Sequence, residues 1–107
     1  MEKNDRHAVI KHIFSYLGFA IKSGAAVFGL DKIKNTKARI GLIILDASMS
    51  EKSKKEILFV AENKGVRTAI FEDIAEILPI KGVKVVAVTN GNLAERIWEC
   101  YKELYPS

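Results

Sequence analysis

The chain has 107 residues, of which 49% are hydrophobic and 28% are charged, the size and balance of one ordinary globular domain over residues 1–107. No apolar run approaches the roughly 20 residues that cross a bilayer. The first residues lack the apolar stretch of a secretion signal. With Cys100 as the single cysteine, these features predict a cytoplasmic protein whose one thiol is a small hydrophobic residue packed on a helix.

Basic residues are concentrated in the first half of the chain. Residues 1–55 hold 11 Lys and Arg against 5 Asp and Glu, whereas residues 56–107 hold 6 against 8. The densest basic stretch runs from Lys32 to Arg39. Such an uneven distribution favours a face that binds a polyanion, although a pair of solvated helix faces would give the same pattern.

The spacing of apolar residues predicts the elements of secondary structure. Helical periodicity marks the helices, and continuous runs of β-type apolar residues mark strands buried on both faces. In chain order, the expected elements are a helix over residues 5–22, a strand over 25–28, a brief helix over 30–35, a strand over 40–45, a helix over 50–63, a strand over 66–71, a short acidic helix over 72–78, a strand over 83–88 and a helix over 92–104. This alternation predicts an α/β fold, in which a mixed, mostly parallel sheet of four strands carries helices on both faces.

Capping residues support two of these helices. The stretch from Ser48 to Glu51 has the spacing of a capping box, and Gly65 is a suitable end for the helix that follows. We expect the core face of this helix to include Leu58. Asn90 is a suitable cap for the last helix.

The residue types that support catalysis or metal binding are scarce. His7 and His12 are five residues apart on the first predicted helix, so they lie on different faces, and no further Cys or His completes a metal site. The glycines between Gly24 and Gly29 form neither a dinucleotide fingerprint nor a Walker loop, and no nucleophile elbow is present. We therefore expect a protein that is not an enzyme and has no cofactor, metal or small-molecule substrate.

Asp46 is the one position that suggests enzyme-like chemistry. It follows a buried strand, where open α/β sheets place their ligands, and the turn resembles the phospho-acceptor turn of receiver domains. Those domains also need an acidic pair after the first strand and a lysine after a late strand, whereas this chain begins with a helix and has Thr89 and Asn90 after its late strand. A role in the turn or in helix capping is therefore favoured for Asp46.

Several segments together resemble a known family. They are Leu17-Gly18-Phe19-Ala20, Ser23-Gly24, Gly29-Leu30-Asp31-Lys32-Ile33, Lys37-Ala38-Arg39, Gly41-Leu42-Ile43-Ile44-Leu45-Asp46-Ala47-Ser48, Asn63-Lys64-Gly65-Val66 and Val85-Val86-Ala87-Val88-Thr89. In order and spacing these segments are similar to the L-seven-Ae/L-thirty-e superfamily of ribosomal proteins, in its bacterial stand-alone branch, over about four-fifths of the chain. The resemblance implies a three-layer α/β/α sandwich with a four-stranded sheet, and binding of kink-turn RNA.

In this family the RNA site comprises the start of the second helix, nearby basic residues and an apolar loop before the final strand. Phosphates suit a helix N-terminus, and apolar side chains stack on splayed bases. The resemblance therefore implies RNA as the partner, ribosomal or otherwise structured, and the ribosome itself as a possible assembly, with no membrane. The implied RNA-binding residues are Lys22, Gly29, Leu30, Asp31, Lys32, Lys34, Lys37, Ile80, Lys81 and Gly82.

The base-reading signature departs from the family pattern. Leu30 stands at a small-residue position, Asp31 replaces an asparagine, and Lys32 reverses the charge of an acidic or amide residue. The departures leave a second interpretation open, in which the chain is a protein-interaction module that keeps the fold and has lost RNA binding.

Overall fold

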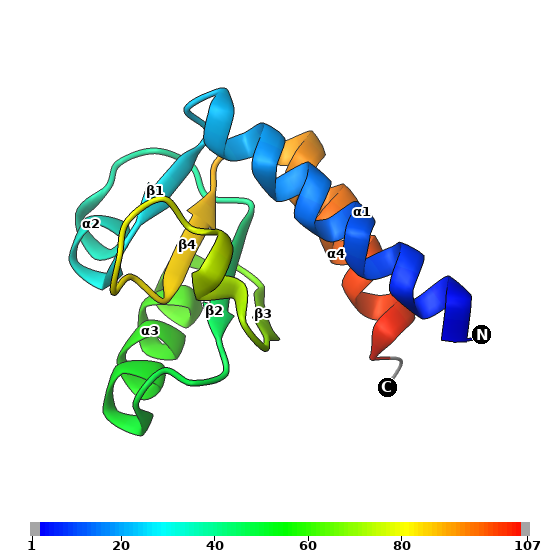
Figure 1. Ribbon diagram of the computed structural model, residues 1–107. Coiled ribbons are helices and arrows are strands. Elements are labelled where there is room, and N and C mark those ends of the chain that lie inside the picture. The colour runs from blue at the N-terminus through cyan, green and yellow to red at the C-terminus, as the bar shows by residue number, and fades with distance from the viewer. Residues whose placement is uncertain (1–2, 106–107) are drawn as a thin grey trace.

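The computed structural model of the protein describes residues 3–105. Its order of elements agrees with the apolar pattern (Figure 1). The elements are α1 (Lys3–Lys22), β1 (Ala26–Phe28), α2 (Leu30–Asn35), β2 (Leu42–Asp46), α3 (Glu51–Lys64), β3 (Thr68–Phe71), the single 3₁₀ turn η1 (Ile74–Ile77), β4 (Val85–Val88) and α4 (Gly91–Leu104).

The four strands form one sheet in the order β1-β4-β2-β3. β4 pairs antiparallel with both β1 and β2, and only β2 and β3 run parallel. The sheet is mixed, so the prediction of a mostly parallel sheet is wrong. Uniformly apolar strands indicate burial on both faces, and helices that cover both faces produce this burial whichever way the strands run.

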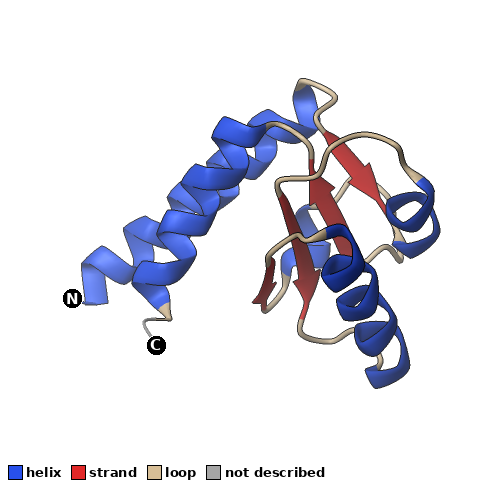
Figure 2. Cartoon of the chain, turned by 180° about the vertical axis from the view of Figure 1, so that it is seen from behind, coloured by secondary structure: helices blue, strands red, loops and turns tan. Residues whose placement is uncertain are grey.

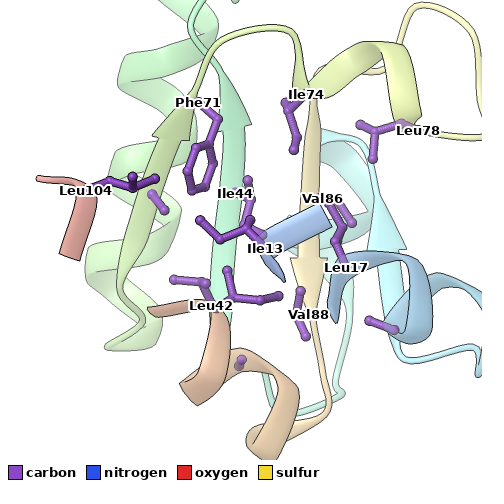
Figure 3. Packing of buried hydrophobic residues seen from close by; sticks show 14 of the residues in the cluster. Ile13, Leu17, Leu42, Ile44, Phe71, Ile74, Leu78, Val86, Val88 and Leu104 are labelled. Atoms are coloured by element: carbon purple, nitrogen blue, oxygen red, sulfur yellow. The ribbon is translucent and has the colours of Figure 1, made fainter. Parts of the chain in front are cut away.

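Alternate residues of the central strands enter two separate hydrophobic clusters. Leu42 and Ile44 of β2 pack with α1 and α4 (Figure 3), whereas Ile43 and Leu45 pack with α2 and α3. Figure 2 accordingly shows α1 and α4 side by side on one side of the strands, and α2 and α3 on the opposite side. The period of two along each strand therefore divides the core between the two faces.

Three strands begin two residues later than predicted, at Leu42, Thr68 and Val85. The apolar residue two positions before each of these strands, Ile40, Val66 or Val83, packs in or against a core cluster without belonging to the strand. Ile40 is buried, and Val66 and Val83 lie against the clusters. An apolar run thus reports burial, while strand pairing covers only part of that run.

The ends of the helices follow the expected capping chemistry with one correction. Ser50, and not Ser48, caps α3, because its side chain accepts a hydrogen bond from the Ser53 N–H. Gly65 ends α3 in the left-handed conformation, and Asn90 caps α4 by accepting from the Leu93 N–H, both as predicted. The prediction that Leu58 is a core residue is wrong, since 41% of it is exposed.

A close approach to α4 explains the glycine directly before β2. The Gly41 N–H donates to the Val88 carbonyl oxygen at 2.8 Å. A Cβ atom at Gly41 would lie 2.6 Å from the Cβ of Ala94 on α4. Glycine at this position therefore lets the last helix cross the sheet at short range.

We expect Gly41→Ala to lower the free energy of unfolding by about 1–3 kcal/mol, because the added methyl group meets a packed one. Ala94→Gly alone should cost about 1 kcal/mol as a helix substitution. The double variant should cost less than the sum, since the clash is absent. Urea unfolding of all three measures this coupling.

Gly18→Ala is the matched control, because nothing lies within 4 Å of a Cβ at this helical glycine. It should be neutral or stabilise by up to about 1 kcal/mol. Strictly additive costs for Gly41→Ala and Ala94→Gly would contradict the close approach.

Candidate nucleic-acid interface

The start of α2 and the loop before β4 meet at one corner of the sheet. Gly29 precedes α2, and its N–H donates to the carbonyl oxygen of Val85, the first residue of β4, at 3.1 Å. Gly29 has φ of 90°, a conformation that side chains rarely adopt. Figure 1 shows the loop before β4 (yellow) beside α2 (cyan).

The loop presents an apolar side chain at this corner. Ile80 is 42% exposed, although it is a large hydrophobic residue. The Val83 N–H donates back to the Ile80 carbonyl oxygen at 3.2 Å, and Gly82 in between has φ of 86°. A tight turn therefore holds Ile80 and the neighbouring Lys81 at the surface.

On α2 itself, the predicted site residues divide between core and surface. Leu30 is half-buried and packs against the cluster that contains Ile33, so it supports the helix from inside. Asp31 and Lys32 are exposed. The surface formed by Gly29, Asp31, Lys32, Ile80 and Lys81 is called the α2 corner below.

Three predicted residues lie outside the α2 corner. Lys22 is the last residue of α1 and precedes β1, whose first residue pairs with Val88 at the carboxyl end of β4. Gly29 follows the last residue of β1, so it lies at the opposite end of that strand. Lys37 precedes Gly41 by four residues in the chain, and the Gly41 N–H donates to Val88 at the carboxyl end of β4. Lys34 lines a hollow between α2 and α3. The sequence-based set therefore covers more than one surface.

Two adjoining hollows contain residues that sequence reasoning left out of the site. The first, of about 280 Å³, lies between α2 and α3 and includes Lys34, Phe59 and Lys64. The second, of about 390 Å³, includes Lys37, Arg39 and again Lys64. Phe59 could have been found from sequence, because it is apolar yet falls outside the helical stripe that forms the core face of α3. These two hollows are called the α2–α3 groove below.

Asp46 is the only buried charged side chain of the described residues, with 3% exposure. One carboxylate oxygen accepts from the Ser48 N–H at 2.8 Å and from the Ser48 hydroxyl at 2.7 Å, and the other accepts from the Ala75 N–H at 2.8 Å. The carboxylate thus joins the turn after β2 to η1, the turn role that the sequence favours.

The pKa of Asp46 reflects opposing effects. Burial by itself would raise it, but the hydrogen bonds from Ala75 and Ser48, together with the positive charge of Lys84, outweigh burial and hold the pKa of this carboxyl below its ordinary value. Asp46 is therefore ionised at neutral pH and serves as a structural anion.

Cys100 is the other candidate reactive group of the described residues. Cys100 is half-buried against the core, and burial, with Glu103 and Glu99 nearby, raises the pKa of its thiol, so it stays protonated. Among residues 6–105, no three His, Cys, Asp or Glu side chains gather as metal ligands. In the same range, no helix is long and apolar enough to cross a membrane.

Comparison with known proteins gives a match in structure only. No family model and no curated protein matches the chain. A solved structure described as a protein with unknown function from Bacillus halodurans C superposes with a TM-score of 0.76 at 14% sequence identity, over 84% of this chain and 96% of that one. At this identity, the similarity shows that the chain shares a mixed α/β fold with that protein.

Proposed function

We propose that this chain is an RNA-binding protein of the L-seven-Ae/L-thirty-e superfamily, with that family's three-layer α/β/α sandwich, and that it binds ribosomal or other structured RNA in the cytoplasm. The hydrogen bond from Gly29 to Val85 carries the proposal, because it joins the start of α2 to the first residue of β4, which directly follows the loop that holds Ile80. Helix packing on both faces of the sheet supports the fold.

The α2 corner combines the chemistry that bent RNA needs. Lys32 and Lys81 are exposed cations for phosphates, and Ile80 is an exposed apolar group for a base that has left its stack. Asp31 can accept a hydrogen bond from a base edge but cannot donate one from its side chain. We therefore expect recognition that depends more on RNA shape and charge than on sequence.

The direct test is a titration against a kink-turn RNA and a plain duplex of equal length at two salt concentrations. We expect the kink-turn to bind more tightly, because only the bent RNA offers an unstacked base to Ile80. Equal, salt-sensitive binding to both RNAs would show that the surface reads charge alone. Absence of binding to either would contradict the proposal.

Charge reversal at the α2 corner gives a second prediction. Lys32→Glu combined with Lys81→Glu should weaken kink-turn binding by at least about tenfold and reduce the slope of affinity against salt, because two phosphate contacts are lost. Lys11→Glu with Lys102→Glu, on α1 and α4, makes the same change in net charge at other exposed sites. Equal effects of the two double variants would contradict this placement.

A protein-interaction module on the same fold is the second candidate. It is favoured by Lys32, because the family pattern has an acidic or amide residue at this position and lysine is positively charged. Such a protein would bind neither RNA at moderate salt, and a protein captured from extract would be lost with Lys32→Glu. The salt titration and the capture experiment thus separate the two functions.

A further inference from the structure

Phe59 is a large aromatic side chain that α3 presents to solvent. It is 63% exposed, whereas Ile57, Val60 and Ala61 of the same helix pack against the sheet. Phe59 lines the α2–α3 groove together with Val60. An exposed aromatic residue in a hollow, with no packing role in the core, is a suitable surface for a flat ligand group.

The rest of the α2–α3 groove is basic. Lys34, Lys37, Arg39 and Lys64 line it, and Glu56 is the one acidic residue among its lining residues. Lys64 belongs to both hollows, and its Nζ donates to the Thr36 carbonyl oxygen at 3.3 Å, which holds it between the ends of α2 and α3. Lys64 therefore links the cations of the two hollows, and Phe59 lies in the hollow that also contains Lys34.

Like most cations of residues 6–105, the cations of the α2–α3 groove have no acidic partner within ion-pair distance. Within residues 6–105, the ion pairs are Lys54 with Glu51, Arg67 with Glu95 and Lys102 with Glu99. Arg67 also lies over the ring of Trp98, at 5.1 Å from its centre. The four cations of the α2–α3 groove take part in none of these pairs, so their charge is available to an anion.

We propose that the α2–α3 groove binds a single-stranded flank of the RNA held at the α2 corner, with a base stacked on Phe59 and phosphates on Lys34, Lys37, Arg39 and Lys64. This inference rests on the proposed RNA-binding function. A basic groove that follows the backbone, with an aromatic side chain for the bases, is the arrangement by which proteins hold single strands. A paired base could not stack on Phe59, because its faces are covered within the duplex.

Charge complementarity favours RNA over a protein partner. The centres of protein interfaces are depleted in lysine, whereas three lysines line this groove around one aromatic residue. α2 joins the two surfaces, since it begins at the α2 corner and carries Lys34 into the groove. One RNA can therefore extend from the corner along the helix.

The test compares a kink-turn RNA with the same RNA extended by a single-stranded flank of about eight nucleotides. We expect the flank to tighten binding to the unaltered protein, and Phe59→Ala to remove roughly fivefold or more of that gain, while affinity for the unextended RNA is unchanged. Phe59→Trp should keep the gain. Phe19→Ala is the matched control, because Phe19 is 62% exposed on α1, which packs on the other face.

Lys37→Glu with Arg39→Glu supplies a second measurement that does not depend on Phe59. It should reduce the gain from the flank and its salt dependence, again with the unextended RNA bound as before. A flank gain that Phe59→Ala leaves intact would overturn the inference. The inference would also be overturned if the flank added no affinity and the groove instead bound an acidic peptide or a second copy of the chain in a manner that depends on Phe59.

The same titrations distinguish failure of the proposed function at the α2 corner from failure of the inference about the groove. If the unextended RNA does not bind but the single strand alone binds in a manner that depends on Phe59, the α2 corner is wrong and the groove stands. If the unextended RNA binds and the flank adds no affinity, the corner stands and the groove is wrong.

Discussion

Ile44→Ala is expected to lower the free energy of unfolding by about 2–5 kcal/mol. Ile44 lies at the middle of β2, between β4 and β3, and has no exposed surface. Its side chain packs in the cluster that α1 and α4 close, near Ile13 and Phe71 (Figure 3). Truncation leaves a cavity that helices on one side and the sheet on the other cannot easily fill.

Urea unfolding measures this effect, with the slope against urea expected to stay the same. Ile70→Ala is the matched control, since Ile70 is the same residue type on the edge strand β3 and is 39% exposed. Its loss should cost about 1 kcal/mol, because much of its side chain already contacts water. An Ile44→Ala variant as stable as Ile70→Ala would show that β2 is not central.

Asp46→Asn is expected to cost about 2–4 kcal/mol at neutral pH, because the carboxylate accepts three hydrogen bonds where it is buried. An amide replaces one acceptor oxygen with a donor, which would then face the N–H of Ala75 or of Ser48. Asp31→Asn makes the same chemical change on the exposed surface of α2 and should stay within about 0.5 kcal/mol of the unaltered protein.

The cost of Asp46→Asn should also depend on pH. The folded state lowers the pKa of Asp46, so its ionised form stabilises the fold above the unfolded pKa, and this contribution is lost as pH falls through the folded value. The difference in unfolding free energy between the unaltered protein and Asp46→Asn should therefore shrink below about pH 4. A difference that stays constant from neutral pH down to about pH 2 would contradict a structural role for the ionised carboxylate.

The candidate site was only partly open to sequence reasoning. Gly29, Lys32 and Ile80 were named from the family pattern, and their meeting at one corner depends on a bond between Gly29 and Val85, which are far apart in the chain. Lys22 was named with them, although β1 separates it from that corner. Basic residues that are close in the sequence can lie at opposite ends of one strand, and the local density of charge does not show this.

The α2–α3 groove is a site that sequence reasoning did not find. Its cations come from α2, from the loop that follows and from the end of α3, so the chain does not present them as one cluster. Phe59 was visible as an apolar residue off the core stripe, but its value as a ligand surface depends on which cations surround it. That grouping follows from packing α2 and α3 on one face.

The sequence by itself determined the order of the elements, most residues of the core and the caps at Gly65 and Asn90, because periodicity and capping are local properties of the chain. The tertiary structure decided the strand directions, since burial on both faces leaves the same apolar run in parallel and antiparallel strands. It also decided the close approach of Gly41 to Ala94, and the bonds that bring Ala75 to Asp46 and Gly29 to Val85. These contacts join segments distant in the chain, and only the packing of the whole core specifies them.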